Sequence, residues 1–332
     1  MKKVSIIGGG AWGSAFAVHL SRKKITSHLW IRENEIYEQA LKDRENTVFL
    51  PGVKFPAEVS FFNHIAEAVR STMAVFVAVP SQFCRKVYEM LAPHLTSKQI
   101  IISLTKGIED SSLMRMSEIM EEVFSPYFPP RVAVLSGPSF SREVALGYPT
   151  AVVVASKDLN LARKVQHLVS NLYFRAYAST DVVGVELCGA LKNVIAIAAG
   201  ISYGLELGQN SAAALMTRGL AEIARLGMKL GAKKETFSGL AGIGDLVLTC
   251  TGTLSRNRSV GVELGKGKSL EEITSKMKMV AEGIKNTLSA HQLSKRENVE
   301  LPICEQVYKI LYRHKDPRES MNKLMRRKLR DE

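Results

Sequence analysis

The length and composition of the chain are those of a folded protein with two domains. It has 332 residues, of which 46% are hydrophobic and 23% are charged, and this balance excludes a mostly disordered chain. The formal net charge of +13 favours an anionic partner, which could be nucleic acid, a membrane surface or a phosphorylated small molecule. Aromatic residues are not interleaved with the basic ones, so we expect no nucleic-acid channel.

Cysteine use and hydropathy predict a cytoplasmic protein. The four cysteines are widely separated and form no CxxC or Cys/His cluster, which argues against a zinc site or a redox pair and fits buried thiols in a reducing compartment. The longest uncharged apolar segment, residues 194–205, is too short to span a bilayer. An apolar run follows Lys2 and Lys3, but glycines end it too early for a signal peptide.

The N-terminal sequence predicts a nucleotide-binding βαβ unit. An apolar run at residues 3–7 leads into Gly8-Gly9-Gly10-Ala11-Trp12-Gly13, then a helical pattern and a second apolar run at 27–31. In the pattern G-x-G-x-x-G, Gly8 permits a tight turn, Gly10 lets the backbone approach a pyrophosphate, and Gly13 lets the helix pack closely on the sheet. The helix N-terminus then faces the phosphates. The alternative is a purely structural glycine turn.

The end of the second strand bears on the choice of cofactor. An acidic residue there binds the ribose 2′-OH of NAD, whereas an arginine accepts the 2′-phosphate of NADP. We place Arg32 at this position, with Glu33 directly after it. The sequence therefore predicts that NADP is accepted and leaves NAD open.

Four further apolar runs and a change of pattern define the fold. The runs lie at residues 74–79, 100–104, 132–135 and 151–155, with helical patterns between several of them, as in a mostly parallel sheet covered on both faces. After about residue 185, helical patterns at 189–200, 212–230 and 270–279 replace the strands. We predict an α/β protein, with a Rossmann-like doubly wound parallel sheet in residues 1–187 and an all-helical C-terminal domain in 188–332.

Polar residues follow two of the predicted strands. Lys106 comes just after the run at 100–104, and Ser136-Gly137-Pro138-Ser139-Phe140 follows the run at 132–135. Ligands bind at the carboxyl ends of strands in doubly wound sheets, so Lys106 is placed to reach an anionic substrate there.

A lysine in an apolar helix is the candidate catalytic residue. Lys192 and Asn193 stand at the start of an apolar helical run, where an uncompensated lysine is costly to bury. Lys192 either acts as a general acid and base at a carbonyl oxygen or extends its ammonium group to solvent. Asp245, after a glycine-rich stretch, either caps a helix or pairs with Lys192.

A polar tetrapeptide is the candidate phosphate site. Ser255, Arg256 and Asn257 precede Arg258, and serine, arginine and asparagine side chains all bind phosphate well. The alternative is an ordinary polar start to a helix.

Six motifs together resemble one family, the bacterial soluble NAD(P)-dependent glycerol-3-phosphate dehydrogenases. They are the GxGxWG motif at 8–13, S-x-T-K-G at 103–107, S-G-P-S-F at 136–140, L-K-N at 191–193, G-D-L-x-x-T-C at 244–250 and S-R-N-R at 255–258. They occur in the family's order and cover nearly the whole chain.

The resemblance implies a role for each matching residue. Lys192 would be the general acid and base. The cofactor would be bound by Gly8, Gly10, Ala11, Trp12, Gly13, Arg32, Lys106, Ser141, Arg256, Val280 and Glu282. The substrate would be bound by Lys106, Gly137, Ser139, Lys192, Asn193, Asp245, Thr249, Ser255, Arg256 and Asn257. No metal is expected.

The resemblance also implies an activity. It is the interconversion of sn-glycerol 3-phosphate and dihydroxyacetone phosphate with NADP or NAD, supplying glycerol phosphate for phospholipid synthesis. A homodimer is expected, with no nucleic-acid partner and no integral membrane contact. Two alternatives stay open at this point: a related two-domain hydroxy-acid or sugar-phosphate dehydrogenase, and a non-catalytic NAD(P)-sensing or nucleic-acid-binding protein.

Overall fold

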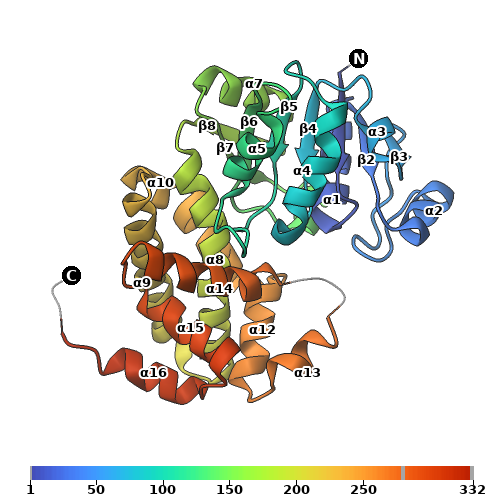
Figure 1. Cartoon of the computed structure of the whole chain (residues 1–332). Helices are drawn as coiled ribbons and strands as arrows, with labels where there is room; N and C mark the ends of the chain where they lie inside the picture. Colours follow the sequence, from blue (N-terminus) through green and yellow to red (C-terminus); the bar gives the residue numbers. More distant parts are fainter. Residues whose placement is uncertain (1, 278–280, 330–332) are drawn as a thin grey trace. The chain divides into compact units, whose positions relative to one another are not determined.

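The chain divides into two compact units in a computed structural model, which describes residues 2–277 and 281–329. The first unit comprises the chain up to Lys106 together with Met114–Glu186. The second comprises Gly107–Leu113 together with the chain from Leu187 onward. Figure 1 labels most of the helices and strands used below.

An eight-stranded sheet forms the first unit, in the order β3-β2-β1-β4-β5-β6-β7-β8. The strands are β1 (Lys3–Ile7), β2 (Thr26–Trp30), β3 (Val59–Phe62), β4 (Ala74–Val77), β5 (Ile100–Ser103), β6 (Arg131–Ser136), β7 (Thr150–Ala155) and β8 (Phe174–Ser179). All neighbours are parallel except β6 and β7, which are antiparallel. The predicted α/β class with a mostly parallel sheet is therefore confirmed.

The helices of the first unit alternate with its strands. They are α1 (Ala11–Ser21), α2 (Asn34–Asp43), α3 (Ile65–Ala68), α4 (Cys84–Leu91), α5 (Met116–Phe124), α6 (Ser141–Leu146) and α7 (Leu159–Val169), with short 3₁₀ turns η1 (Ser81–Phe83) and η2 (Ala92–His94). Phe16 on α1 anchors this helix in the core: its ring centre lies 5.0 Å from that of Phe76 on β4 and 6.2 Å from that of Phe174 on β8. Helix α1, which follows the glycine-rich loop, is thus fixed on the sheet.

Two strands were missed by the sequence analysis, and both lie at edges of the sheet. β3 pairs with β2, and β8 pairs with β7. In each, buried residues alternate with exposed ones over at least part of the strand, as at Phe174, Arg175 and Ala176. Edge strands that are covered on one face lack the continuous apolar runs by which the central strands were recognised.

Beyond Ser179, the described residues form helices and loops only. The elements are α8 (Val182–Gly204), α9 (Gly208–Lys229), α10 (Lys234–Phe237), the π-helical turn η3 (Leu240–Gly244), α11 (Asp245–Thr251), α12 (Arg256–Gly265), α13 (Leu270–Thr274), α14 (Glu282–Arg296), α15 (Pro302–Arg313) and α16 (Pro317–Met325). This confirms the predicted helical second half.

Helix α8 is longer than the apolar segment predicted from the sequence. It has 23 residues and a mean hydropathy of 1.7 over its apolar window, so by length and composition alone it could cross a membrane. However, 94% of that window is buried inside the fold, which is typical of a core helix. The prediction that Lys192 stands at the head of a helix is wrong, since this residue lies in the middle of α8.

Helices α8 and α12 pack backbone to backbone along a glycine seam, which we define as Gly200, Gly204, Gly261 and Gly265. A Cβ atom added at any of the four would collide with a backbone carbonyl oxygen of the other helix. Small residues four apart on both helices permit this close approach. The seam fixes α12, whose first turn carries Arg256 and Asn257, against the helix that carries Lys192.

Candidate active site

The glycine-rich loop between β1 and α1 has the backbone geometry of a phosphate-binding turn. Gly8 adopts φ +120°, a conformation that favours glycine, and its N–H donates to the carbonyl oxygen of Trp30 at 3.1 Å. A Cβ at Gly13 would collide with the carbonyl oxygen of Gly8, which explains the third glycine. A Cβ at Gly10 would meet no protein atom within 4 Å.

The first turn of α1 leaves its N-terminus open to an anion. Gly10 occupies the N-cap position, no side chain caps the helix, and no acidic residue stands in the first turn, where Ala11 and Trp12 lie. Unsatisfied N–H groups and the positive end of the helix dipole favour a phosphate at such a position. The indole Nε1 of Trp12 is buried without a hydrogen-bond partner among the described residues.

Arg32 lies just beyond β2, which ends at Trp30, and its side chain is exposed. Its Nε and Nη2 lie 2.9 and 2.5 Å from Oε1 of Glu33, and its guanidinium carbon lies 5.9 Å from the centre of the Phe83 ring. The two residues that made the cofactor prediction ambiguous thus pair with each other. A 2′-phosphate would have to compete with Glu33 for the guanidinium group.

Three predicted substrate residues meet at the carboxyl ends of β5 and β6. The Nζ of Lys106 donates to the carbonyl oxygen of Gly137 at 2.7 Å and to Oγ of Ser139 at 3.4 Å. Ser139 Oγ donates to the same carbonyl oxygen at 2.9 Å. Gly137 adopts φ +140°, and a Cβ there would lie 2.9 Å from Cα of Val152. Ser141, predicted to bind the cofactor, is the half-buried first residue of α6.

Lys192 is buried in the second unit and paired with Asp245. Its side chain is 7% exposed, and its Nζ lies 2.5 Å from Oδ1 of Asp245 and 2.8 Å from Oγ1 of Thr249. The Thr249 hydroxyl donates to the carbonyl oxygen of Asp245 at 2.6 Å. The ammonium group therefore does not extend to solvent. Asp245 pairs with the lysine and is not a helix cap, because the N-cap position of α11 is occupied by Gly244.

A chain of buried amides joins the predicted phosphate helix to its neighbours. Asn257 donates from Nδ2 to Oδ1 of Asn193 on α8 at 2.9 Å, and its own Oδ1 accepts from the N–H of Gly283 on α14 at 2.9 Å. Asn193 donates to the carbonyl oxygen of Gly189 at 3.3 Å. The Asn257 amide thus bridges three helices.

Ser255 and the two arginines after it have different environments. Ser255 caps α12, since its Oγ accepts from the N–H of Arg258 at 3.2 Å. This is the arrangement expected if the tetrapeptide were an ordinary polar start to a helix. The Arg258 guanidinium stacks 4.5 Å from the centre of the Tyr203 ring. Arg256 is accessible to solvent; partial desolvation lowers its pKa, and the charge of Glu282 opposes that shift.

Of the two residues predicted to close over the cofactor, the structure describes one. Glu282 is the first residue of α14, next to Gly283 and near enough to influence Arg256. Val280 lies outside the described residues.

The comparisons with known proteins agree along the whole chain. A model of the NAD-dependent glycerol-3-phosphate dehydrogenase N-terminus matches residues 3–162, and a model of the C-terminus of the same family matches residues 181–322. The glycerol-3-phosphate dehydrogenase [NAD(P)+] of Citrifermentans bemidjiense is 51% identical over 331 residues, covering 100% of this chain and 99% of the relative. That of Syntrophotalea carbinolica is 50% identical over 329 residues, covering 99% of each.

The chain belongs to the NAD-dependent glycerol-3-phosphate dehydrogenase family. The crystal structure of glycerol-3-phosphate dehydrogenase from Coxiella burnetii superposes with a TM-score of 0.94 at 37% identity, covering 98% of this chain and 99% of that one. The resemblance stated from six motifs is therefore confirmed.

Two buried asparagines that support the glycerol-3-phosphate dehydrogenase site were missed. Asn46 is fully buried, and its Nδ2 donates to the carbonyl oxygen of Gly9 at 2.6 Å and to Oγ of Ser14 at 3.1 Å. Asn286, also fully buried, donates to the carbonyl oxygen of Ala190 at 3.1 Å and accepts from the N–H of Ile108 at 3.4 Å.

Asn46 holds the glycine-rich loop, and Asn286 holds α8 at Ala190, two residues before Lys192. The contacts through which they hold these segments join residues distant in sequence, so no local pattern could have revealed them. The one available signal is compositional: Asn286 stands on the otherwise small or apolar face of α14.

Proposed function

We propose that this chain interconverts sn-glycerol 3-phosphate and dihydroxyacetone phosphate with NADPH or NADH as the hydride donor. The observation that carries the proposal is the buried pair of Lys192 and Asp245 in a chain 51% identical to a relative named glycerol-3-phosphate dehydrogenase [NAD(P)+]. The first unit would bind the dinucleotide and the second the substrate. The predicted domains 1–187 and 188–332 differ from these units mainly in Gly107–Leu113, which belongs to the second unit. The product would supply phospholipid synthesis.

The glycine-rich loop fits a dinucleotide. Its open α1 N-terminus and the empty space beside Gly10 would receive the pyrophosphate, and Arg32 would reach the adenosine ribose. Lys106, Ser141, Arg256, Val280 and Glu282 would complete the cofactor site. When bound, the nicotinamide supplies or accepts the hydride, which is the chemistry that the side chains cannot provide.

Lys192 would move the proton in the reaction. In its ammonium form it donates a proton to the C2 oxygen of dihydroxyacetone phosphate as the carbonyl becomes an alkoxide; in the reverse direction the neutral amine takes the hydroxyl proton. Asp245 favours the ammonium form, and Thr249 restricts where Nζ points. The lysine would thus be held for proton transfer in a buried position.

The substrate phosphate would be held by cationic and polar side chains. Ser255, Arg256 and Asn257 lie at the N-terminus of α12, where the helix dipole also favours an anion. Lys106, Gly137, Ser139 and Asn193 would also contact the substrate. The net charge of +13 would attract the phosphate from solution.

The proposed chemistry uses no metal. Among residues 2–277 and 281–329, no group of three His, Cys, Asp or Glu side chains could hold a metal ion. None of the four cysteines, which all lie in the described ranges and are buried, forms a disulfide, and this supports a reducing compartment such as the cytoplasm. We also propose a homodimer, which light scattering would test.

Steady-state rates test the proposed reaction. The chain should oxidise NADPH and NADH only in the presence of dihydroxyacetone phosphate and should reduce NADP or NAD with sn-glycerol 3-phosphate. Turnover of a carboxylate hydroxy acid, with none of glycerol phosphate, would show that the protein is instead a related dehydrogenase with another substrate.

A further inference from the structure

The chain passes between the two units at three points. It leaves the first unit after Lys106, returns at Met114, and leaves again after Glu186 inside helix α8. The intervening segment, Gly107–Leu113, belongs to the second unit. The residues near Met114 and at Glu186 lie in the first unit, next to the last two of these points.

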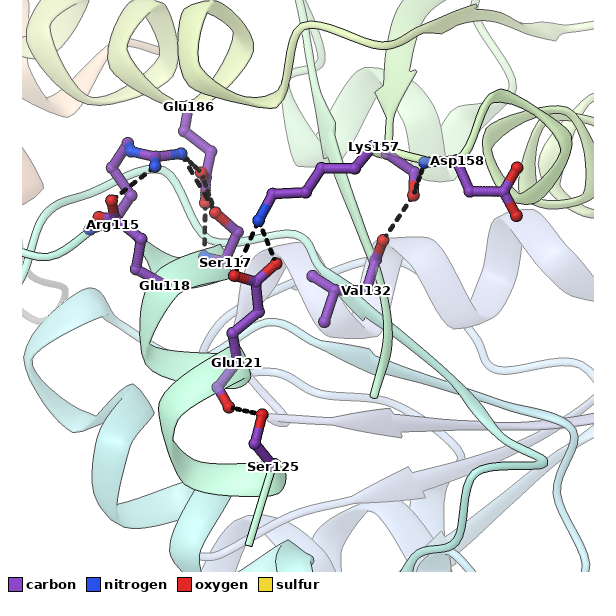
Figure 2. Close-up of polar contacts among 10 residues, drawn as sticks. Arg115, Ser117, Glu118, Glu121, Ser125, Val132, Lys157, Asp158 and Glu186 are labelled. Carbon is purple, nitrogen blue, oxygen red and sulfur yellow. Dashed lines mark hydrogen bonds and ion pairs between the residues drawn. The ribbon is translucent and has the colours of Figure 1, made fainter. Parts of the chain in front are cut away.

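The carboxylate of Glu186 ties the last two of these points together. It accepts from the N–H of Ser117 at 2.8 Å, from the Ser117 hydroxyl at 2.6 Å and from Nη1 of Arg115 at 2.8 Å. Figure 2 shows the Glu186 side chain descending from its helix toward these two residues. Arg115 and Ser117 directly follow Met114, where the chain returns to the first unit. The Glu186 carboxylate therefore bonds to a residue, Ser117, that lies 69 positions earlier in the chain.

Burial makes this link costly to break. The Glu186 side chain is 5% exposed and that of Arg115 is 15% exposed. Desolvation raises the pKa of Glu186, while Arg115 and the Ser117 bonds oppose the rise. A buried carboxylate that loses its partners keeps its desolvation penalty, so the bonded arrangement is strongly preferred over an open one.

The base of the link is itself fixed in the first unit. Arg115 also pairs from Nη2 with Glu118 at 2.6 Å, and Oε2 of Glu118 accepts from the backbone N–H of Arg115 at 2.8 Å at the start of α5 (Figure 2). Met116, Ile119 and Phe124 of that helix are fully buried. Glu186 is thus bonded to a helix that packs in the core of the unit.

Lys192 lies six positions beyond Glu186 on α8, about 9 Å along the helix axis. Resting on the proposed function, we propose that Glu186, Arg115 and Ser117 form a joint that anchors the N-terminal part of α8 to α5 and so fixes the direction of the helix that carries Lys192. Glu186 is then a positioning residue for hydride transfer: it orients the helix that carries Lys192 without touching substrate or cofactor.

The experiment replaces Glu186 and leaves the nucleotide loop intact. Glu186→Gln keeps the side-chain size and one acceptor but removes the charge that Arg115 and Ser117 bind. We expect kcat per NADPH-binding site to fall about tenfold, because proton and hydride transfer need a precise geometry. The NADPH dissociation constant should stay within about twofold. Hydrogen exchange of the amides in Gly107–Leu113, measured without ligand, should become about tenfold faster.

The matched control is Glu118→Gln. It removes the other carboxylate bound to Arg115, which lies within α5 and does not reach α8. Its kcat and its exchange in Gly107–Leu113 should be unchanged. If Glu186→Gln does not fold, Ser117→Ala removes one bond to Glu186 and should shift both measurements in the same direction.

The outcomes separate the joint from the proposed reaction. The proposed joint would be refuted if the Glu186 or Ser117 variant kept both the wild-type kcat per binding site and the wild-type hydrogen exchange. It would also be refuted if Glu118→Gln lowered kcat as much as Glu186→Gln does. If the wild-type chain does not turn over dihydroxyacetone phosphate, the proposed function is wrong, and the exchange rates alone then decide on the joint.

Discussion

The Nζ of Lys192 lies 2.5 Å from Oδ1 of Asp245, 53 residues further along the chain, and the pair is buried. The two residues come from α8 and α11, so folding of the second unit is needed to form the pair. An ion pair removed from water gains little net stability, because desolvation offsets the attraction. A buried pair that contributes little stability is therefore a candidate for a functional arrangement.

Lys192→Ala should remove most of the turnover and leave NADPH binding nearly intact. General acid–base catalysis typically contributes ~10²–10⁴-fold, so kcat should fall by about that factor. Thr249→Val is the matched control, because it removes one hydrogen bond to Nζ but keeps the ion pair, and its loss should be much smaller. Wild-type kcat in Lys192→Ala would refute the proton-transfer role.

Arg32→Asp should raise KM for NADPH far more than KM for NADH. An aspartate repels the 2′-phosphate and can accept a hydrogen bond from a ribose 2′-OH. Glu33→Gln should have the opposite effect, because it releases the guanidinium from its present carboxylate partner. Steady-state kinetics with both cofactors measure the two ratios. Unchanged ratios in both variants would show that neither side chain contacts the ribose.

Arg256→Lys should impair catalysis although the charge is conserved. A guanidinium can bind two acceptors through its planar fork, whereas an ammonium is a point charge on a flexible stem. A charge-assisted hydrogen bond is worth ~1.5–3 kcal/mol, so kcat/KM for dihydroxyacetone phosphate should fall roughly 10–100-fold.

The control for Arg256 is Arg258→Lys on the same helix, where the guanidinium stacks on Tyr203. It should leave kcat/KM near the wild-type value. A silent Arg256→Lys, or equal losses in both variants, would remove Arg256 from the site.

His19 should make the first unit less stable at mildly acidic pH. Burial lowers its pKa to about 4, and its Nε2 lies 2.7 Å from the carbonyl oxygen of Val169. The unfolded chain takes up a proton below pH ~6.5 that the folded chain does not, so the free energy of unfolding falls as pH drops from ~6.5 toward 4. The loss should be about 2 kcal/mol between pH 7 and pH 5.

His19→Gln provides the test, because glutamine keeps a donor but does not titrate. Thermal melts at pH 7 and pH 5 should show a smaller drop in Tm for the variant than for the wild type. Equal drops would mean that other groups govern the acid sensitivity.

Gly261→Ala should destabilise the second unit by about 2–4 kcal/mol. The added methyl would collide with the carbonyl oxygen of Ile197 and force α8 and α12 apart. Ser259→Ala, at an exposed position on the same helix, is the control and should change stability by less than about 0.5 kcal/mol. Similar Tm values for Gly261→Ala and the wild type would contradict the close packing described above.

The central strands and the glycine-rich loop could be predicted because their signals are local. A Val/Ile run or a G-x-G-x-x-G pattern lies within a dozen residues. Its residue types are required by the local backbone conformation, so the pattern can be recognised without knowledge of the tertiary fold. The edge strands β3 and β8 gave weaker patterns because each is partly exposed. The depth of Lys192 in α8 was also misjudged, because Asp181 caps the helix and moves its start upstream: Oδ1 of Asp181 accepts from the N–H of Gly184 at 2.9 Å.

Only those site residues whose chemical type is unusual for their sequence context could be predicted. Lys192 and Asp245 were named as possible partners because a buried lysine needs an opposite charge. Asn46 and Asn286 could not be found, since each bonds to segments brought close only by the tertiary fold. Gly107–Leu113 joins the second unit through similar contacts, such as Ser289 Oγ to Oδ1 of Asp110 at 2.8 Å.

The glycine seam between α8 and α12 limits how this protein could be engineered for other substrates. Gly200, Gly204, Gly261 and Gly265 have no side chains. Substitutions by smaller residues are therefore impossible at these contacts, and larger residues would collide with the backbone of the other helix. The spacing of Lys192 from the first turn of α12 is consequently set by backbone contact and cannot be tuned in small steps. A variant that accepts a longer phosphorylated ketone would have to gain its room from side chains outside the seam.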